Sequence, residues 1–400
     1  MNPLTSIRVE AKALWSGGKG WYLIVVSAAW ALLLGTRMIY PVLLPHLRES
    51  FGLSLTLAGF LVTTLWLSSA IGQLPSGILA DRYSERLVMT AGTVAVTLAI
   101  LAVVAAPTAA PLFVATALVG IGQSLYPIAR ITMLTEIYPD RIGSALGVTM
   151  ASGDLGQTVL PPVAGALAVA VAWQAGLGFM APLLAVAAVA LWVLLPKQSG
   201  SESALDELSA GTARYVLAEL RRPNMAFILV ILFLYILIWQ AFTGFYPTYL
   251  IEEKGKSSST AALLFSLFFA MGIVVKPVAG AVYDRVGIRL SLVVVFSGPV
   301  FGFALLPVLD SIPALVVLTA AVSMMLGSGA ITQSYLSESF SEDMRGTGLG
   351  VVRTTTATLG ATGPVLFGVI ADRGYFDEGY FVLAAIMLAI LLLTLRLSEP

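Results

Sequence analysis

The stretches GILADRYSER at 77–86 and GAVYDRVGIR at 280–289 decide how this chain of 400 residues is organised. Their Gly, Asp-Arg and final Arg positions coincide at one constant offset of 203 residues, without a gap. The same offset relates further glycines and prolines, namely Gly147 to Gly350, Pro161 to Pro364 and Gly165 to Gly368. Each copy lies between long apolar runs, so the repeated unit is a membrane unit. The sequence therefore predicts a membrane protein built from two similar halves.

The composition excludes several classes of protein. Hydrophobic residues make up 58% of the chain and charged residues 11%, with a mean hydropathy of +0.92, which lies outside the range of soluble domains. Cysteine is absent and His46 is the one histidine, so disulfides and metal sites built on thiolates or several imidazoles are excluded. The formal net charge is zero, which argues against a nucleic-acid partner. We expect no cofactor and no metal.

Twelve apolar runs are long enough to cross a bilayer, which takes roughly 20 residues per helix. They fall near 21–46, 53–79, 87–106, 111–136, 143–171, 174–195, 225–250, 259–282, 290–309, 312–336, 346–370 and 379–396. We predict an all-α membrane protein of twelve transmembrane helices in two six-helix bundles with pseudo-two-fold symmetry. Residues 1–195 and 225–400 are the expected bundles. The interval 196–224 is the expected cytoplasmic linker with an amphipathic helix, which either joins the bundles or docks a regulator.

Lysine and arginine predict the orientation. If both termini are cytoplasmic, fourteen of these residues lie in inside segments and four in outside loops, as the positive-inside rule requires. The first apolar run is too long for the apolar core of a cleaved signal peptide, so we interpret it as the first span. The prediction is a multi-pass protein of the plasma membrane with both termini inside the cell.

The repeated stretch resembles the signature loop of the major facilitator superfamily, and the resemblance covers essentially the whole chain. That loop reads Gly, three residues, Asp-Arg and then basic residues; Tyr83 and Ser84 depart from the pattern, and the second copy is closer to it. The resemblance implies two bundles around a central cavity that opens alternately to each side, and a monomer. It also implies a latch that holds one of these states, although the same charges could merely orient the loops. The candidate latch residues are Gly77, Asp81, Arg82, Arg86, Glu136, Arg141, Gly280, Asp284, Arg285, Arg289, Glu338 and Arg345.

Glycine and proline interrupt spans five and eleven, which read GDLGQTVLPPVAG at 153–165 and LGATGPVLFG at 359–368. Span five loosely resembles the Gly-Pro motif of the family's antiporters, but Leu160 and Ala164 replace two glycines. This departure argues against drug:proton antiport. Bent helices at a cavity wall are the expected structure.

Five ionisable residues lie within predicted spans: the basic residues Arg37, Arg130, Lys276 and Arg353, and the acidic residue Asp154. A charge at the centre of a span costs about 2.5–3.5 kcal/mol on insertion scales, so such residues face a cavity or a partner. The excess of positive charge predicts a water-filled cavity of positive potential. Arg37 and Asp154 lie at similar depth and are expected to pair. Asp154 is then either half of a structural salt bridge or the proton-coupling group, with a pKa that responds to Arg37.

Lys276 stands in a Lys-Pro-x-x-Gly segment before the second signature loop. This place resembles the one where monocarboxylate transporters carry a basic residue that binds the substrate carboxylate. Lys276 and Arg353 also lie on spans eight and eleven, as the basic residues of oxalate exchangers do; the alternative is that both bond to carbonyl groups between the bundles. The predicted substrate-binding residues are Arg37, Tyr40, Gln123, Tyr126, Arg130, Lys276, Gln333 and Arg353.

Two observations on neighbouring residues complete the candidate site. Arg130 shares a helix face with Gln123 and Tyr126, and its partner in the repeat is Gln333, which favours a cavity over snorkelling of Arg130 to the interface. Aromatic residues in the spans could line the same cavity, although each alone is better explained by helix packing or by anchoring at the interface. They are Tyr40, Trp66, Tyr126, Trp239 and Tyr246.

The residues favour a secondary transporter for a small organic anion such as a carboxylate, driven by proton symport or by exchange for a counter-anion. The alternative is a proton-coupled efflux pump for drugs or metabolites, which would need acidic groups in the cavity and a fuller Gly-Pro motif. A substrate-sensing receptor on the same fold would need a long soluble domain. No nucleophile–base pair, metal cluster or phosphate-binding loop occurs, so an enzyme is not expected.

Overall fold

The structure is a computed structural model that describes residues 14–15, 18–197, 223–339 and 345–397. These residues are almost entirely helical. The first half contains α2 (Gly20–Phe51), α3 (Leu55–Arg82), α4 (Glu85–Val104), α5 (Ala109–Ser124), α6 (Tyr126–Ile137), the 3-10 helix η2 (Pro139–Arg141), α7 (Ile142–Ala170), α8 (Trp173–Gly178) and α9 (Met180–Leu194). The helix predicted within the linker 196–224 lies outside the described residues.

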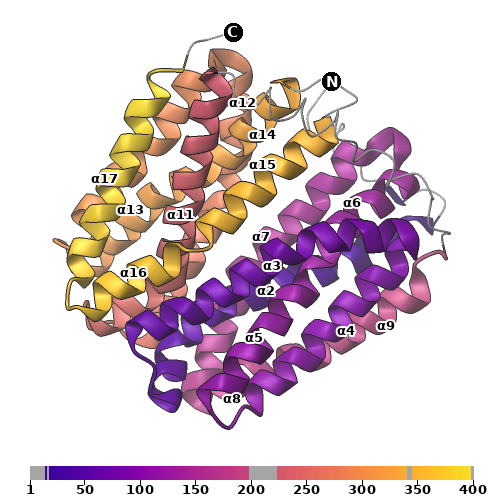
Figure 1. Ribbon diagram of the computed structural model, residues 1–400, viewed down its shortest axis with the longest axis horizontal. Coiled ribbons are helices and arrows are strands. Elements are labelled where there is room, and N and C mark those ends of the chain that lie inside the picture. The colour runs from indigo at the N-terminus through magenta and orange to yellow at the C-terminus, as the bar shows by residue number, and fades with distance from the viewer. Residues whose placement is uncertain (1–13, 16–17, 198–222, 340–344, 398–400) are drawn as a thin grey trace.

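The second half repeats this order of long and broken helices. It contains α11 (Pro223–Glu252), α12 (Ser258–Leu305), α13 (Ile312–Ser323), the 3-10 helix η3 (Met324–Gly327), α14 (Ser328–Ser339), α15 (Arg345–Gly360), α16 (Gly363–Asp372) and α17 (Phe376–Thr394). Figure 1 shows the two halves as separate groups of helices that lie side by side. The prediction of an all-α membrane protein with two bundles is confirmed.

Ten segments of the described chain are long and apolar enough to cross a membrane. One of them, α12, contains two helices, because Gly287 adopts the left-handed conformation (φ 75°) in its middle, which glycine tolerates best. The 29-residue helix α7 is also long enough to span, although it lies outside those ten. Counting both arms of α12 and adding α7 gives the twelve spans expected.

The two copies of the signature stretch differ in how they turn the chain. In the second copy the chain bends at Gly287 without a separate loop. The equivalent residue of the first copy is Ser84, which caps α4 by accepting a hydrogen bond from the N–H of Leu87 at 3.3 Å. A serine cap and a left-handed glycine are alternative ways to begin a new helix after a tight turn.

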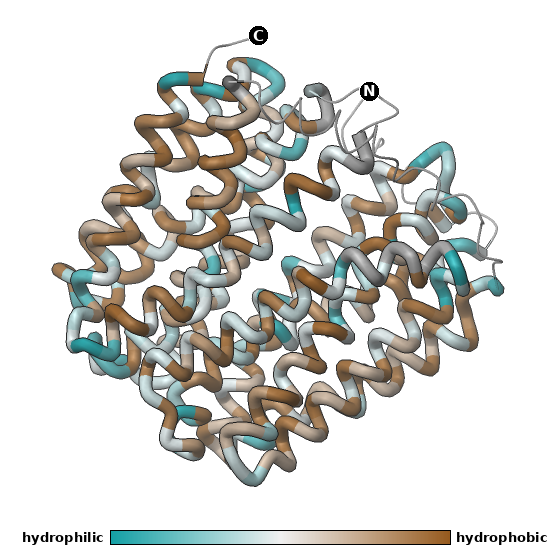
Figure 2. The backbone as a smooth tube through the Cα atoms, in the orientation of Figure 1, coloured by the Kyte–Doolittle hydropathy of each residue, from teal (hydrophilic) through white to brown (hydrophobic). Residues whose placement is uncertain are grey.

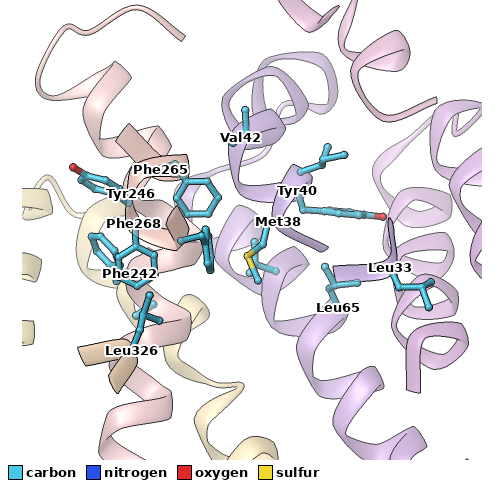
Figure 3. Close-up of a cluster of buried hydrophobic side chains, with 14 of the residues drawn as sticks. Leu33, Met38, Tyr40, Val42, Leu65, Phe242, Tyr246, Phe265, Phe268 and Leu326 are labelled. Carbon is cyan, nitrogen blue, oxygen red and sulfur yellow. The ribbon is translucent and has the colours of Figure 1, made fainter. Parts of the chain in front are cut away.

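Apolar residues cover the outside of the bundles as well as their interior. Figure 2 shows polar residues mainly at the helix ends, with hydrophobic residues along the helix lengths. Exposed valines and leucines such as Val186, Val193 and Leu98 face outward, where a bilayer would solvate them. Within the second bundle, Phe242 of α11 packs edge-on against Phe268 and Phe303 of α12, beside Tyr246 (Figure 3).

Two seams join the bundles, and the first lies between α3 and α16. A Cβ atom on Gly59 would clash with the carbonyl oxygen of Pro364, and one on Gly368 would come within 2.5 Å of the carbonyl oxygen of Leu55. The helices can therefore touch backbone to backbone only because glycine occupies both positions, as in other membrane helix pairs.

The same two helices also cap each other across the first seam. Asp372, at the end of α16, accepts hydrogen bonds from the N–H of Leu55 at 3.0 Å and the hydroxyl of Thr56 at 2.9 Å. In return, Thr63 of α3 accepts a bond from the N–H of Val365 in the first turn of α16, at 3.2 Å. Each helix thus satisfies N–H groups that the other leaves unpaired at its start.

The second seam lies between α7 and α12 and is related to the first by the repeat. Gly165 and Ala262 are the repeat partners of Gly368 and Gly59, and a Cβ atom on Gly165 would lie 3.3 Å from that of Ala262. This approach is looser than at the first seam. An ion pair between Asp154 and Lys276 crosses the second seam instead.

The bundles meet at the end away from the termini and separate toward the end where the termini lie (Figure 1). An ion pair between Arg48 and Glu252 joins them at the closed end. At the other end, the candidate latch residues Arg82, Asp284, Arg285 and Arg289 are exposed. The side chains of Asp81, Glu338 and Arg345 lie outside the described part of the structure, so the latch stays a prediction.

Candidate substrate and coupling site

Arg37 of α2 is held by neutral partners inside the first bundle. Its Nε donates to Oε1 of Gln123 at 2.8 Å, and its Nη2 donates to Oγ of Ser69 at 2.7 Å. The guanidinium carbon lies 4.6 Å from the centre of the Trp66 ring, a favourable cation–π geometry. Gln123 also donates to the carbonyl oxygen of Leu33 at 3.0 Å, which orients the amide. Arg37 is therefore positioned firmly without a carboxylate among the described residues.

Asp154 of α7 pairs with Lys276 of α12 and not with Arg37. The Nζ atom of Lys276 lies 2.6 Å from Oδ1 of Asp154, with 37% and 11% of the two side chains exposed. Gln157, one turn along α7, is a second donor at 3.4 Å. The expected pair between Arg37 and Asp154 was wrong. Arg37 is directed to α3 and α5, whereas Asp154 is directed to the opposite bundle.

Arg130 of α6 is buried, with 6% of its surface exposed, so it does not snorkel to the interface. Its Nη1 donates to the hydroxyl of Thr149 at 2.8 Å, and its guanidinium lies 4.2 Å from the centre of the Trp30 ring. The Nε of Arg130 is buried and has no hydrogen-bond partner in the described structure. Trp30 also stacks on Tyr126 with ring centres 5.9 Å apart.

Arg353 of α15 and Gln333 of α14 form the corresponding contact of the second half. Nη2 of Arg353 donates to Oε1 of Gln333 at 2.8 Å, and both residues are exposed. Gln333 is the repeat partner of Arg130. In each half, an arginine and a neutral polar residue therefore join the fourth span to the fifth: Arg130 with Thr149, and Gln333 with Arg353.

Two predicted contacts lie inside the first bundle. Tyr40 is 1% exposed and its hydroxyl accepts a bond from Thr116 at 3.4 Å; Figure 3 shows its ring turned away from the second bundle. Tyr126 is fully buried and donates to the carbonyl oxygen of Val26 at 2.9 Å. In this conformation both tyrosines stabilise packing, and their contact with substrate stays a prediction.

The sequence reasoning missed four polar or aromatic partners of the candidate residues: Trp30, Ser69, Thr149 and Gln157. Each was detectable as a polar or aromatic residue within an apolar span. Gln157 follows Asp154 by three positions and Trp30 precedes Arg37 by seven, spacings that place residues on one helix face. Ser69 and Thr149 belong to other helices than the arginines they contact, so spacing alone could not assign them.

The arrangement resembles a binding site for an anion more than one for a cation. Arg37, Arg130 and Arg353 have no carboxylate partner within the described part of the chain, while Asp154 is already neutralised by Lys276. Their partners are amides, hydroxyls and indole rings, which orient a guanidinium without cancelling its charge.

Comparison with known proteins agrees with the fold. The chain is 25% identical to a hexuronate transporter of Bacillus subtilis over 360 residues, 85% of each chain. It is 23% identical to a nitrite extrusion protein of the same organism over 320 residues, 79% of each chain. The crystal structure of a mutant of the nucleoside transporter NupG matches with a TM-score of 0.79 and 13% identity, covering 94% of this chain and 99% of that one.

The match to a known family extends over most of the chain and is not limited to the signature stretches. The model of the Major Facilitator Superfamily matches residues 25–361 and 255–400. Together with the two bundles, the repeated signature and the apolar spans, this match shows that the chain is a multi-pass membrane protein that belongs to the Major Facilitator Superfamily of transporters.

Proposed function

We propose that the protein is a secondary transporter for a small organic anion that carries a carboxylate, by proton symport or by anion exchange. One observation carries the proposal: Arg37, a charged residue within the first span, has only neutral partners and no carboxylate partner in the described structure. A guanidinium binds a carboxylate through two parallel hydrogen bonds. A substrate carboxylate is therefore its natural missing partner.

Unpaired arginines at this depth need an aqueous anion to balance them. Burying a charge without a partner is unfavourable, and the guanidinium groups of the partly buried Arg37 and the buried Arg130 have only neutral partners among the described residues. Arg130 belongs to the first bundle and Arg353 to the second. An anion between the bundles would be attracted by positive charge from both.

The conformation fits alternating access in its inward-open state. Both seams and the Arg48–Glu252 pair lie away from the termini, and the excess of basic residues in the predicted inside segments favours cytoplasmic termini. The open end would then face the cytoplasm of a cell whose plasma membrane holds the protein. Rocking one bundle against the other would open the opposite end.

Lys276 and Asp154 provide a means of coupling. A substrate carboxylate that reaches Lys276 competes with Asp154 for the same ammonium group. A buried carboxylate that has lost its cation favours the uptake of a proton, so substrate and proton would move together. If the counter-anion takes the place of the proton, the same competition gives exchange.

The names of two relatives agree with an anionic substrate. One is a transporter of hexuronate, a carboxylate, and the other extrudes nitrite. Both are anions of a single negative charge, and such a charge fits arginines that have no carboxylate partner in the described structure.

Uptake into proteoliposomes tests the proposal. We expect Arg37→Gln and Arg353→Gln to lower kcat/KM for a carboxylate substrate about 10- to 150-fold, because a hydrogen bond to a charged group contributes about 1.5–3 kcal/mol. Arg373→Gln, which makes the same change at an exposed residue beyond α16, is the matched control. Unchanged carboxylate uptake in both site variants would rule out the anion site. Transport of lipophilic cations alone would favour the efflux alternative.

A further inference from the structure

We propose that Trp66 and Trp239 make the site selective for an anion whose carboxylate is attached to a ring, such as a cyclic sugar acid. The inference rests on the proposed transport of organic anions and adds the shape of the substrate to it. It concerns one feature: an aromatic pair, one ring from each bundle, next to Arg37.

The aromatic pair joins the two bundles beside the first seam. The rings of Trp66 (α3) and Trp239 (α11) lie 5.0 Å apart between centres at 74°, and both residues are only partly buried. Along α3, Gly59 and Thr63 make the two preceding contacts with α16. Positions 59, 63 and 66 share one helix face. Trp66 is thus the next contact between the bundles on the side toward the termini.

Trp66 connects the seam to the charged part of the site. The guanidinium of Arg37 lies 4.6 Å from the Trp66 ring centre, so a carboxylate bound to Arg37 would lie next to indole surface. The Nε and Nη2 atoms of Arg37 have partners, whereas Nη1 has none in the described structure. Its free N–H groups can hold one carboxylate oxygen.

The second bundle contributes an unused donor to the same place. The indole Nε1 of Trp239 is buried and has no hydrogen-bond partner among the described residues. Buried indole N–H groups normally find an acceptor. A ligand hydroxyl seated against the pair would supply it, after a small movement of the ring. The two donors without partners, Nη1 of Arg37 and Nε1 of Trp239, then bind opposite ends of one ligand.

An anion that contains a ring can pack on the Trp66–Trp239 pair, whereas a small open-chain anion cannot cover it. The C–H face of a pyranose ring is apolar and packs on an indole, while its hydroxyls reach donors at the ring edge. Binding sites for such ligands combine aromatic walls with a few placed polar groups. An open-chain carboxylate such as lactate satisfies Arg37 and leaves the aromatic surface and the Trp239 donor unused. The pair therefore discriminates between the two classes.

Uptake of D-glucuronate and of lactate by purified protein in proteoliposomes tests the inference. For the wild type we expect a kcat/KM for D-glucuronate at least tenfold above that for lactate. Trp66→Ala should remove most of this preference through a higher KM for D-glucuronate. Trp239→Phe keeps an aromatic ring and removes the N–H donor, so it should raise the same KM several-fold. Trp21→Ala, at an exposed residue of the same type, should change neither substrate.

Other results of these uptake measurements would contradict either the inference or the proposed function. Equal loss of both substrates in Trp66→Ala and Trp239→Phe would assign the pair to closure of the seam and overturn the inference. Uptake of lactate in preference to D-glucuronate by the wild type would overturn it while leaving the proposed function intact. Uptake of neither substrate and of no other carboxylate would instead refute the proposed function. If Trp66→Ala does not fold, Trp66→Phe and Trp239→Phe give the same comparison.

Discussion

Asp154 determines the charge balance between the two bundles. It is 8% exposed as a whole residue, and the charged group that faces it in the described structure is Lys276 on α12. Arg37, on the neighbouring α2, is directed to Gln123 and Ser69. A buried ion pair adds little net stability because desolvation offsets the attraction. Its position across a seam that has to open suggests that the pair serves the transport cycle more than the fold.

Asp154→Asn tests this role directly. The asparagine keeps the size of the side chain and cannot take up a proton, so carboxylate uptake should lose its dependence on pH. Initial uptake rates at a series of pH values measure the effect, with Asp310→Asn as the control because Asp310 is exposed and pairs with Lys254. A variant that retains the wild-type pH profile would exclude Asp154 from coupling.

The sequence could identify the ionisable residues of the site but not their partners. Arg37, Lys276 and Asp154 stood out because charges are rare in apolar spans. Counting residues at about 1.5 Å each placed Arg37 and Asp154 at a similar depth. The direction of each side chain around its helix depends on tilt and on neighbouring helices, and one sequence does not contain that information. For this reason the sequence predicts a pair between Asp154 and Arg37, whereas the partner of Asp154 in the structure is Lys276.

The two seams show how duplicated helices acquire different roles. Between α3 and α16 both key positions are glycine, and Asp372 and Thr63 cap the opposing helices. Between α7 and α12 one glycine has become Ala262, and an ion pair spans the seam. The first seam is thus closed by backbone contact and by caps at the helix ends. The second is instead joined by a pair of ionised side chains.

Gly59→Val should hinder closure of the first seam. Its Cβ would clash with the carbonyl oxygen of Pro364, and overpacking of this kind costs about 1–3 kcal/mol. The population of the present conformation relative to its alternative should fall about 5- to 150-fold. Because the chain lacks cysteine, Asp140→Cys and Arg396→Cys allow spin labels at the termini end of each bundle. Their separation should shorten.

The matched control uses a glycine from the repeat. A Cβ atom on Gly147 would meet nothing within 4 Å, so Gly147→Val in the same labelled background should leave the distance distribution as in the wild type. An unchanged distribution in Gly59→Val would mean that the glycine contact does not limit closure.

At the level of the entire chain, the fold was predictable because it depends on patterns that repeat over many residues. The offset between the halves, the apolar runs and the signature stretch all indicated two bundles, and the structure and the family match confirm them. Which end of the molecule is open in the structure was not predictable. Two conformations of one sequence share the same spans, and the choice between them depends on contacts between bundles, each of which contributes only about a few kcal/mol.

Asp284 offers a test of that choice. It is exposed at the open end of the structure together with Arg285, so it contributes little to the present state. If the signature residues form a latch when the termini end closes, Asp284→Asn destabilises only the conformation in which that end is closed. In the Asp140→Cys/Arg396→Cys background, the fraction of molecules with a short separation should then fall, by about fivefold for a contact of about 1 kcal/mol. Glu378→Gln, at an exposed acidic residue of the opposite end, should leave that fraction unaltered. A short-separation fraction equal to that of the wild type would show that Asp284 merely orients the turn at Gly287.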